Sequence, residues 1–234
     1  MTAFSKINVD ISVADLEFKV SSDNTMKVVC NEKEKLPHAV EVKDDTLSIK
    51  STDTRKWYER LFDYTWNKTS VTVYVPSQEF VSGAIRTSVG NIVIPSDYSF
   101  SSLSVILSTG DIKLNADVKE TLTVESSTGN LTIESKAKNI NLESSVGNQT
   151  LKNVTAEEIH AKASVGNIRF IDCDAASLID VETSTGDVDM TLLSCKTFET
   201  HTSVGEVNVP SSTVGAPLCK IKTSTGDIRV SVKS

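Results

Sequence analysis

Acidic, basic and imidazole side chains recur at matching positions in the C-terminal third of the sequence, and such groups can carry general acid–base chemistry. Counted from a glycine motif described below, they form two adjacent rows: His160, Asp180, Glu199 and Lys220, then Lys162, Glu182, His201 and Lys222. One interpretation is a carbohydrate-active β-helix enzyme, or a divalent metal site, built from His160, Asp180, Glu182, Glu199 and His201. Pairing of opposite charges between neighbouring strands explains the rows more simply, and we favour it.

A second set of polar groups follows each of eight glycines: Asn91, Asp111, Asn130, Asn148, Asn167, Asp187, Glu206 and Asp227. The last three are acids, and their mutual repulsion would attract a cation such as calcium. Calcium-binding β-rolls use a glycine-rich nonapeptide with regular aspartates, whereas each unit here has one glycine and a variable acid. We therefore expect a ladder of Asn/Asp turns, and no metal or cofactor.

The segment 55–68 (RKWYERLFDYTWNK) differs from the rest of the chain because it is rich in aromatic residues. Five of the thirteen aromatic side chains lie within ten residues: Trp57, Tyr58, Phe62, Tyr64 and Trp66. Their spacing allows a short amphipathic helix that would cap an exposed end or side of the fold. The alternative is a contact patch for a protein, peptide, glycan or membrane surface.

Several classes of chemistry lack a signature in this sequence. It contains no P-loop, dinucleotide fingerprint, H-E-x-x-H or G-x-S-x-G motif. Its four cysteines, at 30, 173, 195 and 219, form no C-x-x-C pair and show no zinc-like spacing, so we expect reduced, buried side chains and no disulfide framework. We predict that the protein is not an enzyme and has no catalytic residues.

Composition restricts the partners and the compartment. The chain has 234 residues, 38% of them hydrophobic, and its net charge of −7 includes no basic stripe, which argues against nucleic acid. There is no apolar run long enough for a transmembrane segment. The first twenty residues lack the features of a signal peptide, but a fragment of a longer anchored protein would look the same, so the compartment stays open.

The repeat that positions these groups is centred on glycine. Eight of the ten glycines occur in the pattern Ser, Thr/Val, Gly, Asn/Asp/Glu: Gly90, Gly110, Gly129, Gly147, Gly166, Gly186, Gly205 and Gly226. Their separations are 20, 19, 18, 19, 20, 19 and 21 residues, which is typical of a solenoid. Glycine supplies the positive φ of a tight corner, so we interpret these residues as structural turns.

Each glycine is flanked by apolar residues with a period of two. Ile112 and Leu114 follow Gly110, and Leu122 and Val124 precede Gly129, so each unit contains two half-buried strands. Gln149 is the one polar break in the first pattern. Apolar residues seven or eight positions after glycine suggest a short third side: Val118, Ala137, Val154, Cys173 and Leu193. The sequence predicts an all-β, right-handed parallel β-solenoid with about 19 residues per rung.

The predicted organisation is an irregular N-terminal β region and cap over residues 1–82, followed by an eight-rung solenoid over 83–234, with one continuous domain as the alternative. Asp44 and Asp45 predict a hairpin turn, and Thr69–Val75 predicts a strand that ends at Pro76. The strand predicted at Ile228–Val232 lies near the end of the sequence, so it would leave an open edge through which chains could self-associate.

The repeated S-T/V-G-N/D turns from 88–94 to 224–230, preceded by a less regular β segment, resemble the bacterial putative-adhesin family of β-strand-repeat proteins. The resemblance implies a single-stranded right-handed β-helix associated with the cell envelope, and it brings no catalytic residues to carry over. The hypothesis is a non-enzymatic binding or structural module with a protein or glycan ligand. The carbohydrate-active enzyme and a scaffold that self-assembles through its terminal rungs remain the alternatives.

Overall fold

A computed structural model describes residues 4–23, 25–32, 37–51 and 69–233. Every regular element among them is a β-strand, which confirms the all-β prediction. No helix that could span a membrane occurs in these ranges. The five aromatic residues between Trp57 and Trp66, with their expected cap or contact patch, lie outside the described residues.

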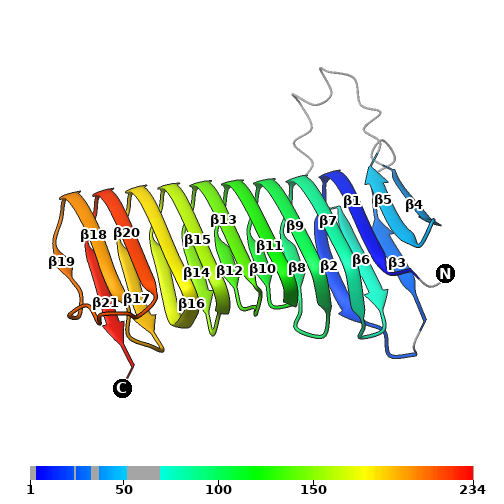
Figure 1. Ribbon diagram of the computed structural model, residues 1–234. Coiled ribbons are helices and arrows are strands. Elements are labelled where there is room, and N and C mark those ends of the chain that lie inside the picture. The colour runs from blue at the N-terminus through cyan, green and yellow to red at the C-terminus, as the bar shows by residue number, and fades with distance from the viewer. Residues whose placement is uncertain (1–3, 24, 33–36, 52–68, 234) are drawn as a thin grey trace, which may run out of the picture.

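The strands form two sheets, and the chain passes from one to the other at the glycine corners (Figure 1). Sheet A contains β1 (Lys6–Val13), β4 (His38–Lys43), β5 (Thr46–Ser51), β7 (Glu79–Val89), β9 (Ser99–Thr109), β11 (Asp117–Thr128), β13 (Asn139–Val146), β15 (Thr155–Val165), β18 (Thr197–Val204) and β20 (Leu218–Thr225). Sheet B contains β2 (Asp15–Val20), β3 (Lys27–Asn31), β6 (Ser70–Val75), β8 (Ile92–Ile94), β10 (Ile112–Leu114), β12 (Leu131–Ile133), β14 (Gln149–Lys152), β17 (Val188–Leu192), β19 (Val207–Asn208) and β21 (Ile228–Val232). The long strand β16 (Ile168–Thr185) contributes to both sheets.

Parallel pairing in register makes the rungs a β-solenoid. In sheet B, Ile112 pairs with Ile92 on one side and with Leu131 on the other. In sheet A, Val124 pairs with Val105 and Leu142. Equivalent residues therefore stack from rung to rung, so every inward position builds one column of the core and every outward position one row of the surface.

The alternating pattern buries one continuous core from Phe4 to Val230. Its N-terminal part contains an aromatic stack, in which the ring centroids of Phe80 and Phe100 are 5.1 Å apart. The polar break, Gln149, points into this core and is fully buried; its Nε2 donates hydrogen bonds to Ser144 Oγ and to the Lys162 carbonyl, at 2.9 and 2.6 Å. Neighbouring groups thus satisfy the Gln149 amide nitrogen, whereas its Oε1 is buried without a hydrogen-bond partner among the described residues.

The short third side consists of brief parallel pairings set off from sheet A by bulges. Phe100 pairs with Val118, and Ala156 pairs with Ala175, and the register shifts directly after each pair. Val118, Val154 and Cys173 are buried here as expected. Leu193 is an exception to the prediction because its side chain is exposed.

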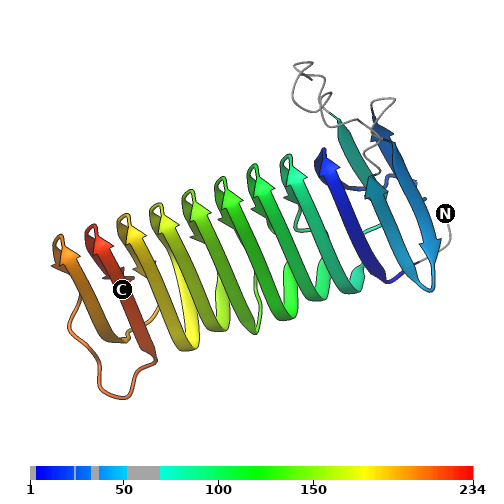
Figure 2. The ribbon, with the colours of Figure 1, turned by 90° about the horizontal axis from the view of Figure 1, so that it is seen from above.

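At both ends the order of the rungs in space differs from their order in the chain. At the N-terminal end, β1 pairs with β5 and β7, so the first rung lies inside the rung made by β5 and β6. At the C-terminal end, β20 pairs with β16 and β18, and β21 pairs with β17 and β19. The red strands β20 and β21 accordingly lie inside the orange strands β18 and β19 (Figures 1 and 2). The expectation that Ile228–Val232 forms the open edge is corrected in part: β19 pairs with Ile228 and Arg229, whereas no described strand pairs with residues 230–232 on that side.

The two ends also differ in how they are covered. Two antiparallel strands close the N-terminal end: β3 pairs with β6, and β4 pairs with β5 through the predicted hairpin, with φ of 49° at Asp44 and 62° at Asp45. We call β3 and β4 the cap strands. Among the described residues, β18 pairs only with β20 and β19 only with β21, so the last rung has no comparable cover.

Candidate functional site

The glycine corners stack so closely that they define a backbone column. Gly129 has φ of +137°, and a Cβ at this position would collide with the carbonyl oxygen of Gly110 in the neighbouring rung. In the first rung, Ala14 occupies the place that corresponds to Gly90, and its N–H donates to the Val89 carbonyl. Glycine is therefore required by its φ and by the rung spacing, as the turn interpretation expects.

The polar residue after each glycine builds a hydrogen-bonded ladder along this column. The Asp111 side chain accepts the backbone N–H of Asn130 at 2.7 Å, and the Asn130 side chain accepts that of Asn148 at 3.1 Å. The ladder ends with Asp187, which accepts from Asp227, and Asp227, which accepts from Glu206, both at 2.8 Å. Each side chain thus satisfies an N–H that the corner leaves unpaired.

Two of the three acids that suggested calcium, Asp187 and Asp227, already share a counter-charge. The Arg229 guanidinium pairs with Asp227 and lies 3.9 Å from Asp187 and 3.4 Å from Asp189. The hydrogen bond that Arg229 donates to Asp189, together with the nearby carboxylates, raises the pKa of Arg229. The structure therefore favours the turn ladder over a calcium site at this end.

The charged face of sheet A contains the predicted residues in a different order. His160 pairs in register with Asp180, Asp180 with Lys220, and Glu199 with Lys220. Lysine therefore separates Asp180 from Glu199, which the sequence register had placed side by side. The cause is the displaced last rung, because β20 inserts between β16 and β18.

Opposite charges consequently alternate along the first row and along the first three residues of the second, which ends with His201 opposite Lys222. His160 Nδ1 is 3.8 Å from Asp180 Oδ2, and Lys220 Nζ is 3.9 Å from Glu199 Oε2. In the second row, Glu182 Oε2 lies 3.8 Å from Lys162 Nζ, and Glu182 Oε1 lies 3.3 Å from Lys222 Nζ. Since all these side chains are at least one-third exposed and matched by a neighbour, the face has the arrangement expected for solvated cross-strand pairing.

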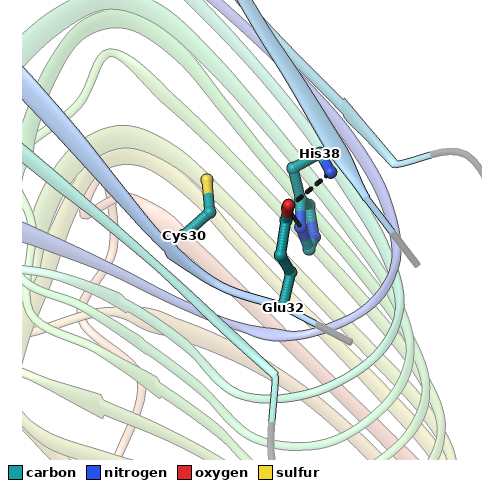
Figure 3. A group of neighbouring side chains, drawn as sticks. All are labelled: Cys30, Glu32 and His38. Carbon is teal, nitrogen blue, oxygen red and sulfur yellow. Dashed lines mark hydrogen bonds and ion pairs between the residues drawn. The ribbon is translucent and has the colours of Figure 1, made fainter. Parts of the chain in front are cut away.

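A different cluster, not identified from the sequence, lies where the cap strands meet (Figure 3). Cys30 in β3, Glu32 just after β3 and His38 at the start of β4 place one potential ligand atom each within 4.8 Å of one another. Glu32 Oε2 accepts the His38 backbone N–H at 2.7 Å and lies 3.0 Å from His38 Nδ1. These hydrogen bonds lower the pKa of Glu32, whereas burial and the nearby Glu32 charge raise that of the Cys30 thiol.

The sequence contained a weak signal for this cluster. Cys30 is two positions from the inward residue Val28, so strand alternation places both on the same face. His38 is likewise two and four positions from Val40 and Val42 in the predicted hairpin. This alternation alone could not show that β3 ends and β4 begins at one corner, because the antiparallel pairing of β3 with β6 was not predicted.

The cysteines fit the expectation of reduced and buried side chains only in part. All four are free; Cys173 and Cys219 are buried, Cys30 is half-buried, and Cys195 is exposed, which corrects the prediction for that residue. Burial raises the pKa of Cys173 to about 11 and that of Cys219 to about 12. These two thiols therefore stay protonated at neutral pH and act as small core residues.

The comparison with protein families identifies the chain. Residues 4–234 match the model described as Toastrack DUF4097. The chain belongs to this family. Among curated proteins, none matches this Toastrack chain.

Two solved structures share the Toastrack protein's fold. One is described as a putative adhesin from Bacteroides fragilis, with a TM-score of 0.60 and 19% identity over 98% of this chain and 93% of that one. The other is described as a putative adhesin from Parabacteroides distasonis, with a TM-score of 0.55 and 15% identity over the same shares, 98% and 93%. The family match and these neighbours confirm the predicted resemblance, and at these identities the structural likeness concerns the fold alone.

Proposed function

We propose that this Toastrack protein is a non-enzymatic binding and structural module, an adhesin-like scaffold of the cell envelope whose long polar faces bind a protein or glycan. A right-handed winding with about 19 residues per rung is part of this proposal. The descriptions of the Bacteroides and Parabacteroides structures as adhesins support the choice of function class.

One observation carries the non-enzymatic part of the proposal. The carboxylates that an enzyme would need on the charged face each lie beside a basic side chain from a neighbouring rung, such as Glu182 between Lys162 and Lys222. Asp180 and Glu199 are two strands apart, or roughly 9–10 Å at the usual strand spacing. Lys220 fills the row between them, so they share no space for a reacting group.

A glycan array combined with a reducing-sugar assay tests this function. The intact chain and a Trp57→Ala, Phe62→Ala, Trp66→Ala variant are compared, with the exposed-site variant Val81→Ala as control. We expect saturable glycan binding without sugar release, retained by the control and lost by the triple variant if the aromatic segment is the contact patch. Release of reducing sugar that stops in an Asp180→Asn, Glu182→Gln variant would instead support the enzyme.

Self-association is a second candidate, favoured by the uncovered last rung. Val207, which corresponds to the buried Ile168 and Val188 of inner rungs, is 44% exposed, and Phe198 is only partly buried. Strands β18 and β19 have a neighbour on one side only among the described residues. An unpaired strand edge beside exposed apolar side chains favours pairing with a second chain.

Light scattering over a range of protein concentrations tests this candidate. Val207→Lys places a charge on the open end and is expected to shift the protein to monomer. Val165→Lys, at an equally exposed position of an inner rung, is expected to leave the association state unchanged. A wild-type protein that stays monomeric at all concentrations would rule this candidate out.

A further inference from the structure

The Cys30, Glu32 and His38 cluster has the composition of a metal site. Thiolate, carboxylate and imidazole are the three side-chain ligands that zinc uses in proteins. Together a thiolate and a carboxylate carry two negative charges, which would balance a divalent cation with neutral imidazole as the third ligand. No other part of the chain that the structure describes brings three such residues this close together.

The fold explains why these residues meet. Chain direction in the cap strands is opposite to that of the rungs beneath, so β3 ends next to the start of β6, where Asn31 pairs with Ser70. The next cap strand, β4, begins next to the end of β5, where His38 pairs with Ser51. The end of β3 and the start of β4 therefore lie at the same corner that glycine occupies in the regular rungs. Cys30 and His38 both face inward there, from different sheets.

The geometry of the cluster is close to that of a coordinated ion. Ligand atoms around a tetrahedral zinc ion are about 3.5 Å apart, given zinc–ligand bonds of about 2.0–2.3 Å. The three potential ligand atoms lie within 4.8 Å of one another, so rotation of side chains can bring them into contact with one ion. Three protein ligands would leave a fourth position for water.

An unpartnered nitrogen is an independent indication that a ligand belongs here. The His38 side chain is 1% exposed, and its Nε2 atom is buried with no hydrogen-bond partner among the described residues. A buried nitrogen without a partner is unfavourable, because desolvation is not compensated. Ligation of a metal ion through Nε2 would satisfy this nitrogen, and Glu32 would then turn from Nδ1 to contact the same ion.

We propose that Cys30, Glu32 and His38 bind a zinc-type divalent cation, which ties the two cap strands together across the N-terminal corner. On binding, the Cys30 thiol releases its proton to solvent and the thiolate sulfur donates an electron pair to the metal. The site is independent of the proposed adhesin-like function, because it lies in the cap and not on the charged face.

Cobalt(II) titration of the purified chain, followed by competition with zinc, tests the proposal. We expect one equivalent of cobalt to give thiolate-to-metal absorption and the visible bands of tetrahedral cobalt, both removed by zinc. Cys30→Ser and His38→Ala are each expected to lower the affinity at least about 100-fold, since loss of a direct ligand should exceed the 10–100-fold cost of losing an outer partner. Cys195→Ser and His201→Ala, which remove the same residue types elsewhere, should bind like wild type.

A measurement on the unmodified chain keeps the test valid if a variant misfolds. Alkylation followed by peptide mass spectrometry should show that zinc slows modification of Cys30 at least about tenfold and leaves that of the exposed Cys195 unchanged. The proposal is overturned if cobalt gives no thiolate band, if Cys30→Ser binds as tightly as wild type, or if zinc does not protect Cys30.

Discussion

At the scale of single residues, the glycine column makes the strictest demand on the sequence. Gly129 combines a positive φ with backbone packed directly against its Cα, whereas Gly215 has φ of +81° and no atom within 4 Å of an added Cβ. We predict that Gly129→Ala lowers the free energy of unfolding by about 3–5 kcal/mol, from backbone strain and overpacking together. Gly215→Ala should cost only about 1 kcal/mol, from strain alone. Urea unfolding of both variants gives the comparison, and equal losses would contradict the stacking argument.

A buried thiol gives a second prediction at this scale, concerning pH. Burial raises the pKa of Cys219 from 9.0 to about 12, so the folded state holds this proton more tightly than the unfolded state. The contribution of this proton to the free energy of unfolding is fully present below pH 9 and is lost as the pH rises toward 12. At pH 11 the loss is about 2–3 kcal/mol.

Cys219→Val removes this titration while nearly conserving volume. Its stability should stay within about 1.5 kcal/mol of wild type at pH 7 and should decline less between pH 9 and 11. Cys195→Val, at an exposed position, should follow the wild-type pH profile. Urea unfolding at pH 7, 9 and 11 measures all three proteins, and parallel profiles would show that Cys219 is not responsible.

At the scale of strands, the displaced strand β20 sets the charge order of the surface. Lys220 lies between Asp180 and Glu199, so Lys220→Glu would place three acids in one row. We predict a loss of about 1 kcal/mol in the free energy of unfolding, because like charges directly opposite each other are destabilising. Lys113→Glu is the matched control, since its neighbours Val93 and Thr132 are uncharged. The loss should shrink at high salt, and a loss unaffected by salt would argue against a charge effect.

The strands themselves could be predicted from the sequence, whereas the order of the terminal ones could not. Alternation around Gly110 and Gly129 sets which residues face inward, and the two aspartates of the cap hairpin identify its turn. Nothing in the pattern of the last two rungs says which lies outermost, because Val207 and Ile228 occupy equivalent positions. Only tertiary packing decides between them, so the alternation of Lys220 with the acids, like the meeting of Cys30 with His38, appears only in the structure.

At the scale of the whole molecule, the first rung joins two regions that are far apart in the chain. Strand β1 pairs with β5 on one side and with β7 on the other, and β2 likewise with β6 and β8. We predict that deleting residues 1–20 leaves the backbone amides of strands β3 to β6 unprotected, because their rung loses its neighbour, while the rungs from β9 onward stay folded. Hydrogen exchange with mass spectrometry measures both regions.

The control for this deletion is a synthetic peptide of residues 1–22 added in trans. The peptide should restore the protection of backbone amides in strands β3 to β6, since it supplies the missing strands β1 and β2. Full protection without the peptide would show that the N-terminal region folds independently. The same measurement tests the division into residues 1–82 and 83–234, which stays a prediction.

The displaced last rung has a consequence for how the chain is made. During synthesis each inner rung can add to the one before it as soon as it leaves the ribosome. Strand β18 cannot, because its register partner in β20 comes 21 residues later (Thr197 to Leu218, 218 − 197), and the place beside β16 has to be kept for β20. A nascent chain that ended before residue 218 would lack β20, so β18 would be free to pair with the edge of β16 that β20 covers in the complete solenoid. Completion of the fold therefore depends on β20 and β21, which are translated after β18 and β19 and insert between them and the inner rungs.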